Sequence, residues 1–147
     1  RASGEQLVLA TRRLNSAMMR SDLADAILDA TIALEILLGD GDGQAISWKL
    51  RMRAAALAGI EGGHAAATAM NDAIATVYAT RSAIVHGGRR RRGNTDEHAE
   101  RDLAAKQLAI DALRQVVKIL IERPEYLDPR RIDSDLSMAP PFATPNA

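Results

Sequence analysis

Residues 23–43 read LADAILDATIALEILLGDGDG, an apolar segment that runs into a glycine-rich turn. Ser21 and Asp22 stand directly before it, where they can cap a helix. The glycines at 39, 41 and 43 can adopt the left-handed conformation in which helices end. The GDGDG turn lacks the downstream glutamate and the ligand register of an EF-hand calcium loop. This stretch therefore predicts a helix over 23–38 and a plain connecting turn, with an inner face of Ile27, Thr31, Leu34 and Leu38.

Similar capping residues, glycines and prolines mark the ends of four further helices. Ser3 to Gln6 have capping-box spacing, and glycines follow the helical patterns that end near residues 58 and 86. Asn94 can cap the last long pattern, which Pro124 closes. The predicted helices cover about 4–20, 23–38, 44–58, 65–86 and 95–122.

Composition supports an all-α fold. The chain has 147 residues, of which 47% are hydrophobic but only 3% aromatic. Alanine and leucine dominate, and both are strong helix formers, whereas the β-branched and aromatic clusters of strands are scarce. We therefore predict an antiparallel bundle of about five helices around one core, with a helical domain over 1–123 and a proline-containing, partly extended tail over 124–147.

The charge balance argues against a generally basic nucleic-acid-binding surface, and the absence of cysteine excludes disulfides and thiolate chemistry. Lysine plus arginine equal aspartate plus glutamate at 19 each, so any nucleic-acid site must be local. The chain has no cysteine and no apolar run of membrane-spanning length, which suits the reducing cytoplasm. The sequence starts at Arg1, and we expect it to be the C-terminal piece of a longer protein whose N-terminal region is missing.

Two arginines fall on apolar helix faces. Arg81 shares a stripe with Ile74 and Val77, and Arg53 lies between apolar residues of helix 44–58. A guanidinium is seldom buried without a partner. We expect Glu35, on the flank of helix 23–38, to pair with Arg53, with Arg81, or with both. The alternative is that each arginine lays its methylenes on the core and extends its charge to solvent.

His86 follows Arg81 by five positions, at the predicted end of its helix. Five residues turn an ideal helix by about 140°, so the two groups meet only if the glycines after His86 bend the backbone, or if a second copy contributes across a two-fold axis. Tyr78, Ser82 and His86 are each one turn apart and form a polar stripe beside Arg81.

This combination of groups suits RNA transesterification. A neutral imidazole can take the proton of the 2′-hydroxyl, and a protonated imidazole can give a proton to the leaving 5′-oxygen. The guanidinium can stabilise the charge of the phosphorane. Such a reaction needs no metal, and the sequence shows no metal-ligand spacing, so we expect no metal and no cofactor. Spacing alone, however, favours a helix-capping histidine beside a structural arginine.

Three segments together resemble the HEPN superfamily (higher eukaryotes and prokaryotes nucleotide-binding), and within it the Apea-like branch. They are ALEILLGD at 33–40, WKLRMRAAALAG at 48–59 and YATRSAIVHGG at 78–88, in the same order on the second, third and fourth helices. With the long last helix, the resemblance covers most of residues 5–122. It implies a dimeric helical bundle, and for many members a metal-independent endoribonuclease with a composite R-x4-6-H site at the dimer interface.

The resemblance also assigns roles to residues. Arg81 and His86 match the R-x4-6-H pair, and Ser82 takes the position after the arginine, where active members usually carry a polar group. Glu35 and Arg53 match positions that support the site. The expected partners are RNA and a second copy of the chain, in anti-phage defence or a stress response. The alternative is a non-catalytic HEPN module that dimerises or binds RNA or nucleotide.

A run of arginines at 89–92 directly follows His86. Arg89, Arg90, Arg91 and Arg92 can hold RNA phosphates, with Tyr78 beside them, although a charge run can also be a solvated loop. No aromatic residue is interleaved with these arginines, which gives little support for base stacking. We expect Trp48 to pack within the bundle rather than to serve as a base platform.

Overall fold

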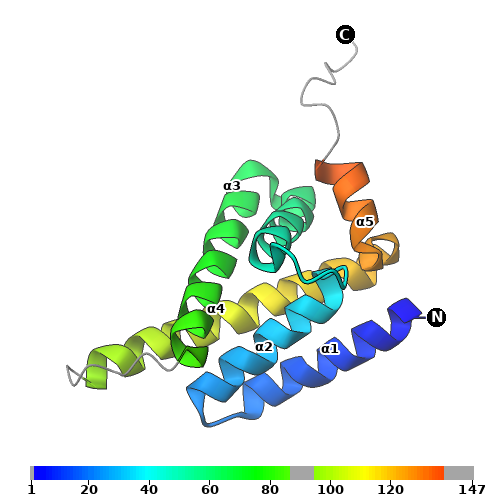
Figure 1. Ribbon diagram of the computed structural model, residues 1–147. Coiled ribbons are helices and arrows are strands. Elements are labelled where there is room, and N and C mark those ends of the chain that lie inside the picture. The colour runs from blue at the N-terminus through cyan, green and yellow to red at the C-terminus, as the bar shows by residue number, and fades with distance from the viewer. Residues whose placement is uncertain (1, 87–94, 138–147) are drawn as a thin grey trace.

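The computed structural model describes residues 2–86 and 95–137. Over these residues the chain is an all-α bundle, as predicted (Figure 1). The described part contains no strand. Its elements in chain order are α1 (Ala2–Met19), α2 (Leu23–Leu38), α3 (Ile46–Val85), α4 (Thr95–Glu122), the 3-10 turn η1 (Pro124–Leu127), α5 (Pro129–Ile132) and the π turn η2 (Asp133–Ser137).

The helix α2 is the centre of the bundle, because it packs against α1, α3 and α4. Asp22 caps its first turn by accepting a hydrogen bond from the Asp25 backbone N–H at 2.9 Å. Its buried Asp29 binds two arginines of the preceding segment, Arg13 at 2.7 Å and Arg20 at 2.9 Å. These ion pairs fix the register of α1 on α2.

The helix α3 contains the two helices predicted at 44–58 and 65–86. They meet at a sharp corner at Gly63, which Figure 1 shows as a change of direction within α3. Gly63 has φ 67° and ψ −157°, a conformation that side chains with a Cβ rarely adopt. A Cβ on the preceding Gly62 would collide with the Cβ of Ala66. We call residues 46–62 the first limb of α3 and residues 64–85 its second limb. The close approach of the two limbs depends on Gly62 and Gly63.

Replacing Gly63 by alanine should lower the free energy of unfolding by about 1–3 kcal/mol, because the left-handed backbone becomes strained. The measurement is urea unfolding followed by circular dichroism. Gly59→Ala is the matched control, since its Cβ would lie at an ordinary 3.5 Å from the Ala67 Cβ. An equal effect of both substitutions would contradict this account of the corner.

Arg53 does not pair with Glu35, nor does its charge reach solvent. Its side chain is only 4% exposed. It donates to the Leu38 carbonyl at 2.7 Å, to both carboxylate oxygens of Asp133 at 2.9 and 2.7 Å, and to Asp40 at 3.1 Å. The hydrogen bond to Asp133 is the main cause of its raised pKa. Arg53 thus joins α2, the GDGDG turn and η2.

Lys49 and Arg53 bind the carboxylates of the GDGDG turn. Lys49 contacts Asp40 at 3.0 Å and Asp42 at 2.7 Å. The hydrogen bond from Lys49 is the largest cause that lowers the pKa of Asp40 to about 2. The turn therefore keeps its carboxylates ionised through protein cations, which agrees with its prediction as a structural connection.

The beginning of the tail differs from the prediction. Residues 124–137 form short helical turns instead of extended chain, because Pro124 and Pro129 each occupy the first turn of a helix, where no backbone N–H is required. Tyr126, Leu127 and Ile132 are buried in the main core. This segment packs against α3 and α4. Residues 138–147 lie outside the described part.

Candidate functional site

An open pocket of about 380 Å³ lies between the two limbs of α3. It brings together four residues that the sequence singled out, Tyr78, Arg81, Ser82 and His86, all from the second limb. The first limb contributes Ile46, Ser47 and Arg51, and the remaining lining residues are Ala75, Ala79 and Val85.

Arg81 is held from two sides. Its Nη2 lies 3.7 Å from the Glu35 Oε1, so the predicted pairing of Glu35 with Arg81 is confirmed. Its guanidinium also stacks 5.7 Å from the centre of the Tyr78 ring. Both partners of the ion pair are partly exposed, at 32% and 25%, so their attraction contributes modestly to stability. The Nε atom of Arg81 is buried and finds no hydrogen-bond partner within the described residues.

Tyr78 connects α3 to α2. Its hydroxyl donates a hydrogen bond to the Glu35 Oε1 at 3.0 Å. Burial, followed by the negative charge of Glu35, raises the pKa of Tyr78 above its ordinary value. The phenol therefore stays protonated and fixes the carboxylate that also contacts Arg81. Glu35 itself does not line the pocket between the limbs, and it acts on the site through Tyr78 and Arg81.

His86 ends the second limb, as predicted. Its backbone N–H donates to the Ser82 carbonyl at 3.0 Å, and it stands as the C-terminal capping residue of α3. The side chains of His86 and Ser82 are both exposed. The imidazole is thus open to solvent and to a ligand in the pocket.

The pocket has a positive lining. Two arginines and one histidine face it, and no carboxylate is among its lining residues. The second arginine, Arg51, was missed by the sequence reasoning. Its Nε donates to the Asn71 Oδ1 at 3.2 Å, a contact between the two limbs. Ser47 and Arg51 lie one helical turn apart and therefore on the same side of the helix. This spacing is the feature of the sequence that could have identified Arg51. An arrangement of this kind suits an anion such as a phosphodiester.

The other predicted residues lie elsewhere. Arg53 is absent from the pocket lining and serves the contacts with Asp133 described above. Arg89, Arg90, Arg91 and Arg92 lie outside the described residues, as does Asn94. Trp48 does not pack within the bundle, since 61% of its surface is exposed.

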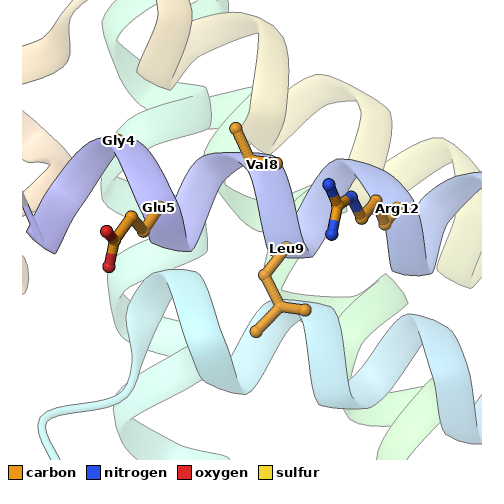
Figure 2. A pocket seen from close by; sticks show the side chains of 5 residues that line it. All are labelled: Gly4, Glu5, Val8, Leu9 and Arg12. Atoms are coloured by element: carbon orange, nitrogen blue, oxygen red, sulfur yellow. The ribbon is translucent and has the colours of Figure 1, made fainter.

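Two other hollows lined by described residues differ from this pocket. Figure 2 shows one on α1, lined by Gly4, Glu5, Val8, Leu9 and Arg12, without histidine or serine. The second, between α3 and α4, contains His98 and Arg101 but also the carboxylate of Asp102. Within residues 2–86 and 95–137, no group of three or more histidine, aspartate or glutamate side chains is placed to hold a metal ion.

Comparisons with known proteins find no match, whether among protein-family models, curated proteins or solved structures. None of the described helices is both long and apolar enough to cross a lipid bilayer.

Proposed function

We propose that this chain is a metal-independent endoribonuclease domain of the HEPN type, with Arg81 and His86 as its catalytic pair. The observation that carries the proposal is the open pocket that both residues line together with Ser82 and Arg51, with no carboxylate among the lining residues. The exposed His86 and the fixed Arg81 also favour catalysis over the alternative in which the histidine only caps its helix.

The proposed reaction is a transesterification within the RNA. The imidazole of His86 takes the proton from a 2′-hydroxyl, and the 2′-oxygen attacks the adjacent phosphorus. The bond from phosphorus to the 5′-oxygen breaks, and the leaving oxygen receives a proton from the imidazolium. The products are a 2′,3′-cyclic phosphate and a 5′-hydroxyl.

Arg81 and Ser82 stabilise the charge that develops on the phosphoryl oxygens. The guanidinium of Arg81 can donate to them, and its orientation is already set by Glu35 and the Tyr78 ring. The Ser82 hydroxyl adds a neutral donor on the same wall of the pocket.

The proposal includes a homodimer, because a second copy related by a two-fold axis can complete the site with its own Arg81 and His86. We propose that Arg89, Arg90, Arg91 and Arg92, which follow His86 in the sequence, bind RNA phosphates. We propose that the domain acts in the cytoplasm, in defence or in a stress response.

The test is ribose dependence. The purified protein should cut a labelled single-stranded RNA in EDTA and leave the same sequence intact when every 2′-hydroxyl is methylated, because the nucleophile is then blocked. Separation of the fragments on a denaturing gel gives the result. Cutting of the methylated strand, or a requirement for added Mg²⁺, would refute this mechanism. If the methylated strand binds but no RNA is cut, the non-catalytic alternative holds.

A further inference from the structure

Trp48 occupies an unusual place for the one tryptophan of the chain. It lies on the first limb of α3 and is 61% exposed, whereas a large apolar side chain on a bundle helix is ordinarily buried. Met52, one helical turn later, is also 41% exposed. The two form an exposed apolar step on the first limb, which no described element covers.

This step adjoins the candidate active site. Ser47, the residue before Trp48, and Arg51, three positions after it, both line the pocket. Side chains three or four apart on a helix are neighbours, with Cβ atoms about 5–6 Å apart. By this spacing Trp48 is a neighbour of Arg51 at the rim of the pocket, outside its lining residues.

The chemistry of the rim points to a nucleotide. A nucleobase offers a flat π-face to an aromatic ring, and its phosphate offers a negative charge to a guanidinium. The pocket supplies positive groups without a carboxylate, and the rim supplies the ring. A purely apolar protein segment could pack against Trp48 and Met52, but it would offer no negative charge to Arg51.

We infer that Trp48 forms a base-stacking subsite of the proposed ribonuclease, in which an unpaired RNA base lies on the indole and Arg51 holds the adjoining phosphate. The inference rests on the proposed function and narrows its substrate to single-stranded RNA, because the bases of a duplex are already stacked on each other. Arg51 is kept in place for this role by Asn71.

The first experiment uses the fluorescence of the protein itself. Because Trp48 is the only tryptophan, its emission reports this subsite alone. A single-stranded 2′-O-methyl oligonucleotide, which cannot be cut, should quench the emission saturably. An abasic strand of the same length and inorganic phosphate should not quench it.

The second measurement is binding of the same labelled oligonucleotide, followed by fluorescence anisotropy. Trp48→Leu should weaken binding about 5- to 100-fold, and Trp48→Phe should retain part of the affinity. Val8→Ser, which removes an exposed apolar side chain on α1, is the matched control and should bind as the wild type does.

Two results would overturn the inference. One is unchanged oligonucleotide affinity in Trp48→Leu, and the other is an emission that responds to protein concentration but not to the oligonucleotide, which would identify a second copy as the occupant. These outcomes are separate from those for catalysis. If cleavage needs His86 but not Trp48, only the stacking subsite is refuted. If binding needs Trp48 but no RNA is cut, only the ribonuclease proposal is refuted.

Discussion

His86→Ala should slow RNA cleavage by about 10²- to 10⁴-fold, the usual contribution of a general acid–base group. The side chain is exposed at the end of α3, so its removal should leave the fold intact. Affinity for an uncleavable 2′-O-methyl RNA should stay close to that of the wild type, because the imidazole acts on protons rather than on the phosphate charge. Single-turnover rates and anisotropy measure the two quantities separately.

The chain offers a matched control for this substitution. His64 is also exposed and also lies on α3, but it follows the corner at Gly63 and does not line the pocket. His64→Ala should therefore cleave RNA at the wild-type rate. Equal rates for both variants would remove His86 from the mechanism.

Mixing two inactive variants tests whether the site is shared between copies. If each site takes Arg81 from one protomer and His86 from the other, mixed dimers of Arg81→Ala and His86→Ala contain one intact site. About a quarter of the wild-type activity should then return when the subunits exchange freely. No recovery would place both groups in the pocket of a single copy.

Arg53→Ala should lower the free energy of unfolding by about 3 kcal/mol, the largest effect on stability that we expect from one side chain. The substitution leaves the Leu38 carbonyl without its donor and leaves Asp133 and Asp40 without their buried cation. It also detaches η2 from α3. Urea unfolding measures the change, and Arg12→Ala, at an exposed position on α1, should change it by less than about 0.5 kcal/mol.

Arg53→Met separates packing from charge at this position. Methionine fills most of the space but donates no hydrogen bond, so its stability should lie between those of the wild type and the alanine variant. The cleavage rate per folded molecule should be unchanged in both variants, because Arg53 does not line the pocket. A loss below about 1 kcal/mol in Arg53→Ala would show that the buried network contributes little.

Local signals in the sequence predicted the helices well. Asp22 caps α2, Pro124 follows the end of α4, and the helix that carries Arg81 ends next to His86. Helical periodicity also predicted that Glu35 pairs with Arg53, with Arg81, or with both, and the pairing with Arg81 is found. Such features depend on residues close in sequence or on the pattern of one helix face.

Features that depend on distant contacts were missed. Asp133 binds Arg53 across 80 positions of the chain, and no local pattern links the two. The tail over 124–147 was predicted to be partly extended, whereas residues 124–137 form short helical turns that bury Tyr126, Leu127 and Ile132. The place of Arg51 in the pocket depends on the approach of the two limbs of α3, which its hydrogen bond to Asn71 joins. The exposure of Trp48 depends on which face of the first limb packs against the bundle.

The most direct test of the central claim is the chemical identity of the ends formed when wild-type protein cuts RNA in EDTA. Transesterification at the Arg81–His86 pocket predicts 2′,3′-cyclic phosphate and 5′-hydroxyl ends, detected by mass spectrometry and lost in the Arg81→Ala/His86→Ala double variant. Fragments with 3′-hydroxyl and 5′-phosphate ends, or cyclic ends that persist in the double variant, would contradict it.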